Sequence, residues 1–158
     1  MKPVKTNAAR ILDREGVRYE LVPYEVDEDD LSAAHLAAQL GQDLDRVFKT
    51  LILKGDKTGH MVCVIPGGAE LDLKKAAKAS GNKNCAMIAM KDLQKVTGYI
   101  RGGCSPLGMK KKFPAHIDET ALLHESVYVS AGLRGVQLQL NPGELIRVTG
   151  AVVADLTA

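Results

Sequence analysis

The spacing of apolar residues along the chain predicts five helices. Between Thr6 and Gly16 apolar side chains recur every three or four residues, as they do on one face of a helix. Thr6 and Asn7 favour the start of this helix, and Gly16 favours its end. Ser32 and Asp72 open two further segments of this kind, each closed by a glycine. We therefore expect helices over residues 6–15, 32–40, 73–79 and 90–97, and one that begins at Pro142.

Runs of β-branched and aliphatic residues predict the strands. The clearest pair covers residues 47–54 and 60–66, and the polar turn 55–59 between them indicates a hairpin. The other expected strands cover residues 17–24, 85–89, 116–118, 126–130, 136–140 and 152–156. Strands and helices mix without a βαβ rhythm, which favours an α+β fold with a mixed, mostly antiparallel sheet that is curled into a barrel-like form and flanked by helices. No repeat or linker interrupts the pattern, so residues 1–158 are expected to form a single domain.

Composition and charge narrow the classes of function. The 158 residues carry a net charge of only +2, so any nucleic acid must be held by local basic patches. Three widely spaced cysteines show no CxxC pattern, which indicates free thiols in a reducing compartment and neither a metal nor a cofactor. The chain begins without an apolar leader and has no apolar run long enough for a membrane. We expect a cytoplasmic protein that binds no membrane and, lacking a helix with a basic face, no DNA.

Two segments are candidates for binding an anion or a carbonyl group. Lys49 shares a strand face with Leu51 and Leu53, so it either reaches the rim of the sheet or holds an anion in a cleft. Residues 102–108 hold three glycines and a proline, and the exposed N–H groups of such a loop can bind a carbonyl oxygen or a phosphate. An ordinary tight loop is the alternative for the second segment.

Three further features are weaker candidates. Ser130 ends a predicted strand at a glycine-rich turn and could stand at the mouth of a cleft, although a plain hairpin turn has the same pattern. Lys110 and Lys111 belong to a run of three lysines that, with Arg101, is the best local patch for phosphate, unless it is a solvated charge run. Cys104 lacks a base near it in the sequence, so we assign it no role.

Five segments, in this order, resemble the YbaK/EbsC family, a group of editing proteins related to the editing domain associated with prolyl-tRNA synthetase. They are residues 47–51, 71–78, 97–99, 102–108 and 128–132. The resemblance covers nearly the whole chain and implies a barrel-like sheet with a pocket for the 3′ end of an aminoacyl-tRNA. It implies catalytic roles for Lys49, Gly103 and Ser130, in which the lysine binds the tRNA end rather than attacking it. It also implies substrate contacts from a second group of residues: Tyr24, Thr50, Gly102, Ser105 and Pro106.

The resemblance further implies an activity, which is hydrolysis of cysteine from Cys-tRNA(Pro), with Cys-tRNA(Cys) as a second candidate substrate. The thiol of the substrate attacks its own ester, so the protein needs no catalytic triad, and prolyl-tRNA synthetase is the expected partner. The chain departs from the family at residues 31–35, which hold no aromatic residue, and at Gln137, which replaces an acidic residue. Editing of Ala-tRNA or Ser-tRNA therefore stays open, as does a non-catalytic module that binds tRNA or a nucleotide.

Overall fold

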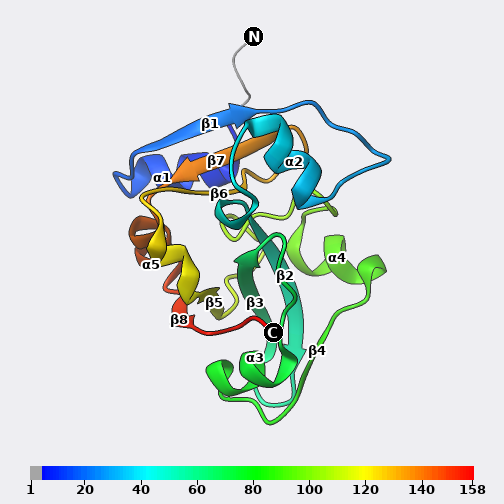
Figure 1. The fold of residues 1–158 in the computed structure, drawn as a ribbon. Helices are drawn as coiled ribbons and strands as arrows, with labels where there is room; N and C mark the ends of the chain where they lie inside the picture. Colours follow the sequence, from blue (N-terminus) through cyan, green and yellow to red (C-terminus); the bar gives the residue numbers. More distant parts are fainter. Residues whose placement is uncertain (1–4) are drawn as a thin grey trace.

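A computed structural model describes residues 5–158, so residues 1–4, part of the segment in which we expected no leader, lie outside the described part. The α-helices within it are α1 (Asn7–Arg14), α2 (Ala33–Leu40), α3 (Leu73–Ser80), α4 (Leu93–Thr97) and α5 (Pro142–Thr149). The strands are β1 (Tyr19–Pro23), β2 (Phe48–Gly55), β3 (Gly59–Pro66), β4 (Cys85–Met87), β5 (Ala115–Asp118), β6 (Val127–Ser130), β7 (Val136–Leu140) and β8 (Val152–Ala154). Figure 1 shows how they are arranged.

The helix ends follow the local chemistry that the sequence indicated. The Thr6 hydroxyl accepts a hydrogen bond from the N–H of Ala9, and the Ser32 hydroxyl accepts one from the N–H of His35. The Asp72 carboxylate accepts two bonds at the start of α3. Helices α2 and α3 end at glycines in the left-handed conformation, Gly41 and Gly81. These capping predictions are confirmed.

Other boundaries differ from the expected ones. The expected helix 90–97 is divided into a 3₁₀ turn, η2 (Met90–Asp92), and the short helix α4. Two further 3₁₀ turns were not expected, η1 (Leu44–Arg46) and η3 (Glu119–Leu123). Strand β8 ends at Ala154 rather than at residue 156, because Leu156 leaves the sheet and is fully buried in a separate cluster.

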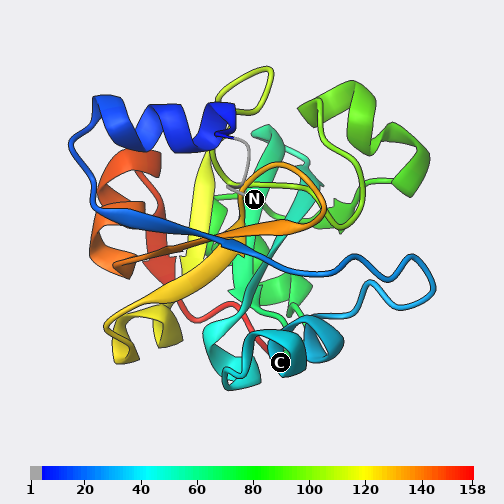
Figure 2. The same cartoon turned by 90° about the horizontal axis from the view of Figure 1, so that it is seen from above.

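The strands form two sheets. One has the order β1-β7-β6 and is antiparallel, and the other has the order β4-β2-β3-β5-β8, in which β5 pairs in parallel with β3 and β8. Figure 2 shows β1 and β7 running across the strands of the β2–β3 hairpin. The mixed, mostly antiparallel α+β fold is confirmed. Neither sheet closes on itself within residues 5–158, so the barrel-like form is not confirmed.

The two faces of the β2–β3 hairpin pack into two different apolar clusters. Residues such as Ile52 and Val64 face the main core, where side chains of α1, α5 and the three-stranded sheet meet them. Leu53 and Ile65, on the opposite face, pack with Ala76 of α3. A third, smaller cluster joins α2 to Val47 and Tyr128. In the part of the chain that is described, no helix is long and apolar enough to cross a membrane.

Candidate active site

A pocket of about 450 Å³ opens where the two sheets meet. Its walls come from the β1–α2 connection, α2, the first half of β2, the segment 87–93, the glycine loop that follows α4, and the ends of β6 and β7. A volume of this order is typical of sites that bind a small molecule or the end of a larger one. The pocket therefore gathers segments from distant parts of the sequence.

The strand pairing explains how Lys49 and Ser130 come to share this pocket. An isolated parallel bridge joins Val47 to Tyr128 and links the two sheets at one point. Lys49 and Ser130 each lie two residues beyond that bridge, so both side chains project on the same side as Val47 and Tyr128. β4 pairs with β2 from Leu53 onward, and the N–H of Ile88 donates one further bond to the carbonyl of Ile52, so within the described residues the edge of β2 from Lys49 to Leu51 stays open. The pocket lies over this open edge.

Six of the predicted site residues line the pocket: Tyr24, Lys49, Thr50, Arg101, Gly102 and Ser130. The Lys49 side chain is half-buried, and among residues 5–158 no carboxylate lies within 4.0 Å of its ammonium group. A cation that is partly removed from water and has no internal counter-ion is suited to an anionic or strongly polarised group of a ligand.

Gly103 and Ser105, in contrast, stabilise the conformation of the loop without contacting the pocket. The Gly103 N–H donates to the carbonyl of Ile100 at 2.9 Å, so it is already used in a turn. A Cβ atom at Gly103 would lie 3.2 Å from the backbone nitrogen of Arg134, which explains the need for glycine. The Ser105 hydroxyl is fully buried and accepts a hydrogen bond from the N–H of Leu107 at 3.2 Å. Neither residue lines the pocket.

Gly102 is the glycine of this loop that lines the pocket, together with Cys104. Its φ of 83° is the left-handed conformation that glycine adopts without strain. Its N–H donates no hydrogen bond within the described part of the chain. The Arg134 side chain fixes this conformation, because its Nε donates to the carbonyl of Arg101 at 2.7 Å. The free backbone donor is thus at Gly102 rather than at Gly103.

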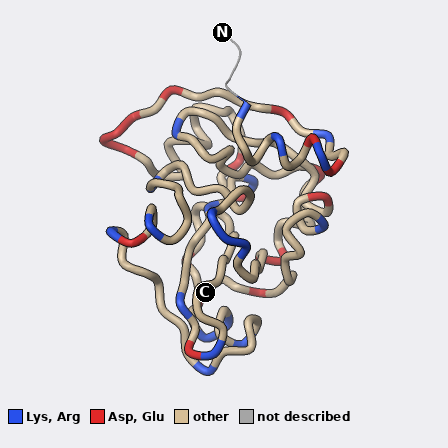
Figure 3. The backbone as a smooth tube through the Cα atoms, turned by 180° about the vertical axis from the view of Figure 1, so that it is seen from behind, with Lys and Arg blue, Asp and Glu red and all other residues tan. Residues whose placement is uncertain are grey.

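The predicted phosphate contacts are divided between two places. Arg101 lines the pocket, whereas Lys110 lies over Gly98, with 3.2 Å between its side chain and an ideal Cβ at that glycine. Lys111 and Pro106 line a separate hollow of about 260 Å³ between α1, the segment 106–115 and α5. In Figure 3 the lysine run is a continuous blue stretch, well apart from the red acidic connection between β1 and α2.

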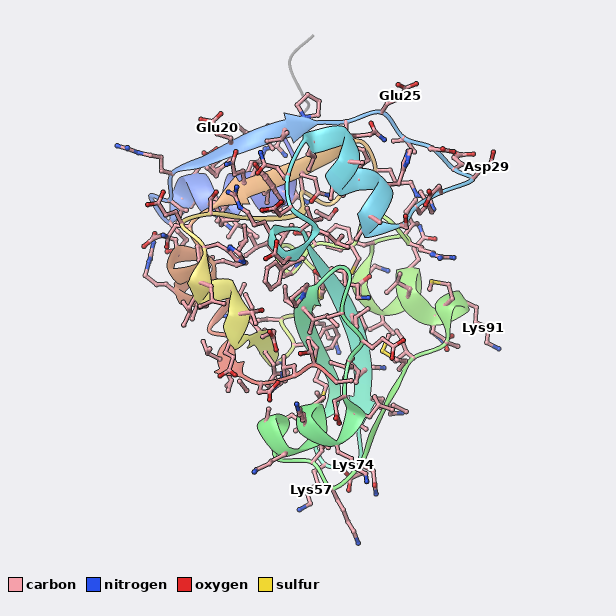
Figure 4. All side chains as sticks on the ribbon, viewed as in Figure 1. Glu20, Glu25, Asp29, Lys57, Lys74 and Lys91 are labelled. Atoms are coloured by element: carbon pink, nitrogen blue, oxygen red, sulfur yellow. The ribbon has the colours of Figure 1, made fainter. Side chains whose placement is uncertain are left out.

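Sequence reasoning missed the acidic rim and the apolar wall of the pocket. His35 lies between Asp27 and Asp30, 3.7 Å and 3.8 Å from their carboxylates. The acidic connection projects outward, as Glu25 and Asp29 show in Figure 4. Leu31, in the segment that lacks the aromatic residue of the family pattern, lines this wall together with Leu36. A rim of this kind could have been inferred only by knowing that residues 25–35 fold back over β2.

Two buried polar atoms in the pocket wall have no partner. Gln137 is 3% exposed, and its side-chain oxygen Oε1 makes no hydrogen bond within residues 5–158. The Thr50 hydroxyl oxygen is likewise buried and unpaired there. Such atoms cost free energy unless a ligand or water satisfies them. Thr50 was expected in the site, and the role of Gln137 was not.

The residues that face the pocket include no activated nucleophile. Burial raises the pKa of the Cys104 thiol to about 12, so it stays protonated at neutral pH. The Ser130 hydroxyl accepts a hydrogen bond from the N–H of Gly132 at 3.1 Å and contacts no histidine in the described structure. No three His, Cys, Asp or Glu side chains of residues 5–158 cluster as metal ligands. The arrangement can bind and polarise a group more readily than it can attack one.

Comparison with known proteins gives consistent results. The model of the aminoacyl-tRNA editing domain matches residues 27–148. EbsC of Enterococcus faecalis, which is named as a candidate Cys-tRNA(Pro)/Cys-tRNA(Cys) deacylase, is 50% identical over 97% of this chain and 93% of its own. A crystal structure described as a candidate trans-editing enzyme for prolyl-tRNA synthetase is 26% identical, with a TM-score of 0.86 over 100% of this chain and 99% of its own. The crystal structure of the protein APE2540 is 27% identical, with a TM-score of 0.86 over 94% and 97% of the two chains.

Proposed function

Because the chain belongs to the aminoacyl-tRNA editing domain family, we propose that it is a trans-editing hydrolase that removes cysteine from Cys-tRNA(Pro), and also from Cys-tRNA(Cys). The pocket is large enough for the aminoacylated end of a tRNA. The acyl group is bound there as an ester, which is already activated toward attack. The protein therefore has to position the ester and stabilise the charge that develops on its carbonyl oxygen.

The observation that carries this proposal is the combination of a free cation and an inert thiol in one pocket. Lys49 and Gly102 supply donors without internal partners, while the one cysteine of the wall, Cys104, has a pKa of about 12. A pocket of this kind lowers the barrier for an attack that originates in the substrate. A substrate that carries its own sulfur nucleophile meets this requirement.

The proposed reaction proceeds within the bound substrate. The cysteine sulfur attacks the ester carbonyl carbon, a carbon–sulfur bond forms, and the bond from that carbon to the ribose oxygen breaks. The thiol proton ends on the departing ribose hydroxyl, and the four-membered thiolactone is then opened by water. Lys49 and Arg101 hold phosphate and ribose groups of the tRNA end, and the N–H of Gly102 donates to the carbonyl oxygen. Tyr24, Thr50 and Ser130 complete the walls around the acyl group.

We further propose that prolyl-tRNA synthetase delivers the substrate in the cytoplasm. The net charge of +2 gives the chain little long-range attraction for tRNA, so a carrier that already holds the tRNA would supply affinity. Addition of the synthetase should raise the deacylation rate at limiting tRNA concentration. No acceleration at any synthetase concentration would count against this partner.

A panel of aminoacyl-tRNAs tests the activity. Purified protein is incubated with Cys-tRNA(Pro), Cys-tRNA(Cys), Ala-tRNA(Pro) and Ser-tRNA(Pro), and the remaining acylated tRNA is measured with time. We expect both cysteinyl substrates to be hydrolysed and Ser-tRNA(Pro), which differs by one oxygen in place of sulfur, to persist. Hydrolysis of the alanyl or seryl ester would replace the proposed specificity. Tight binding of tRNA without any hydrolysis would indicate a non-catalytic module.

A further inference from the structure

The side-chain oxygen of Gln137 is a buried acceptor in the pocket wall, and it has no hydrogen-bond partner among residues 5–158. Strand β7 presents Val136, Leu138 and Leu140 to the main core and turns its two glutamines to the other face. Gln137 lies directly opposite Ser130 in the β6–β7 register, and both line the pocket. Since Ser130 projects on the same side as Lys49, the amide belongs to the wall that the lysine also lines. At 3% exposure the residue makes little contact with bulk water, so its unpaired oxygen carries a desolvation cost.

The neighbouring glutamine on the same face provides a comparison. Gln139 lies two residues further along β7 and does not line the pocket. Its side-chain nitrogen donates to the hydroxyl of Ser126 at 3.1 Å. Gln139 is only half-buried, so solvent reaches its amide, whereas the side-chain oxygen of Gln137 is shielded and has no partner within residues 5–158. The unpaired oxygen of Gln137 therefore reflects the burial of this residue in the pocket wall rather than its position on β7.

The groups that a cysteinyl-tRNA end presents to the pocket differ in what they accept and donate. Phosphates and the ester carbonyl are acceptors, which suit Lys49, Arg101 and the N–H of Gly102. The α-amino group of the amino acid is the strongest donor of the acyl moiety, with up to three N–H bonds. Resting on the function proposed above, we infer that Oε1 of Gln137 accepts a hydrogen bond from the α-amino group of the aminoacyl ester. This contact fixes one substituent of Cα and so orients the thiol relative to the carbonyl carbon.

The carboxylates of the rim do not fill this role. Asp27 and Asp30 flank His35, and their side chains are 45% and 48% exposed. Asp30 also accepts a hydrogen bond from the N–H of Ser32. Water screens these carboxylates, and they lie on the outward-facing connection. A contact deep in the wall discriminates better, because an unpaired group there has no water to replace the ligand.

The test compares Cys-tRNA(Pro) with 3-mercaptopropionyl-tRNA(Pro), which keeps the thiol and the ester but lacks the amino group. Each variant is referred to wild type on the same substrate, so that the different intrinsic reactivity of the two esters cancels. We expect Gln137→Leu to slow deacylation of Cys-tRNA(Pro) by about 10- to 100-fold, the size expected for a lost hydrogen bond to a charged group. The same substitution should change the rate with the desamino substrate by less than about threefold.

Matched variants separate a contact from a loss of structure. Gln139→Leu should leave both rates near wild type, and circular dichroism checks the fold of each variant. Gln137→Glu keeps the size and the acceptor, so the preference for Cys-tRNA(Pro) over the desamino ester should be retained or widened.

Equal slowing of both substrates by Gln137→Leu, or loss of the preference in Gln137→Glu, would overturn the inference. If wild type accelerates both esters equally over their rates in buffer, the inference fails while the deacylase function stands. If wild type hydrolyses neither, the proposed function itself fails.

Discussion

Two buried side-chain amides lie in different regions of this molecule and have opposite environments. Asn82, 8% exposed beside the turn of the β2–β3 hairpin, uses both ends of its amide. Its oxygen accepts from the N–H groups of Lys57 and Thr58 at 2.9 Å and 3.0 Å, and its nitrogen donates to the hydroxyls of Thr58 and Ser80. Gln137, 3% exposed at the pocket, leaves its oxygen without a partner.

The comparison distinguishes a buried amide that stabilises the fold from one whose oxygen stays available to a ligand. The hairpin turn would lose its shape without Asn82, since two backbone donors depend on that oxygen. The pocket keeps its shape with Gln137 unsatisfied, at a cost in stability that a bound ligand returns. Substitutions of the pocket groups should therefore lower activity without destabilising the fold, whereas substitution of Asn82 should destabilise the fold without lowering the activity of the folded protein.

The largest effect is expected at Lys49. Lys49→Ala should lower kcat/KM for Cys-tRNA(Pro) by about 100- to 1,000-fold, because it removes the free cation of the pocket, while the free energy of unfolding changes little. Single-turnover deacylation and urea unfolding measure the two quantities. Lys54→Ala, at the exposed lysine in the otherwise buried second half of the same strand, is the matched control. Retained activity in Lys49→Ala would remove the lysine from the site.

Substitution of Asn82 should have the opposite outcome. Asn82→Leu should lower the free energy of unfolding by about 2–3 kcal/mol, because the N–H groups of Lys57 and Thr58 are left unpaired. The folded fraction should still deacylate Cys-tRNA(Pro) at the wild-type rate. Urea unfolding and a rate corrected for folded protein check this, with the exposed Asn84→Ala as control. A stability equal to wild type would show that the turn does not depend on Asn82.

Gln137 should show a smaller effect on stability, and of the other sign. Replacing an unsatisfied buried amide by leucine should raise the free energy of unfolding by about 1 kcal/mol. Gln139→Leu, which breaks the bond to Ser126, should lower it by about 1 kcal/mol. Thermal or urea unfolding of the two variants gives the comparison directly. Destabilisation in both would mean that the oxygen of Gln137 has a partner after all.

Cys104 should have the smallest effect on activity. Cys104→Ala should change deacylation by less than about threefold, since a thiol with a pKa of about 12 supplies no thiolate at neutral pH. The Cys104 thiol should instead affect the free energy of unfolding at alkaline pH. The thiol keeps its proton in the folded protein and loses it in the unfolded chain above pH 9, so stability falls as the pH rises from 9 toward 12. The variant should lose less stability over that interval in urea unfolding.

Some of these features can be predicted from the sequence alone, and others cannot. The helix caps at Thr6, Ser32 and Asp72 are local, so the residues themselves predicted them correctly. The bridge that joins Val47 to Tyr128 is not local, and with it the sharing of one pocket by Lys49 and Ser130. That neighbourhood came from the resemblance to a family rather than from any spacing in the chain.

Other parts of the site depend on the three-dimensional arrangement of the chain and cannot be predicted from the sequence. Whether Gly102 or Gly103 offers a free N–H depends on one turn that Ile100 closes. Whether Lys110 reaches the pocket depends on how the loop lies over Gly98. The unpaired oxygen of Gln137 is a property of its surroundings, because Gln139 has the same residue type, strand and face. No pattern of residue types distinguishes the two glutamines.

The central claim is that the pocket binds and orients an ester whose own sulfur attacks. The most direct test is the rate of deacylation of Cys-tRNA(Pro) relative to S-methylcysteinyl-tRNA(Pro), measured with the same protein under single-turnover conditions. Methylation keeps the sulfur and the amino group but removes the thiolate. We predict that the methylated ester is hydrolysed at least about 100-fold more slowly, close to its rate in buffer. Equal rates for the two esters would contradict the account, because the protein would then have to supply the nucleophile itself.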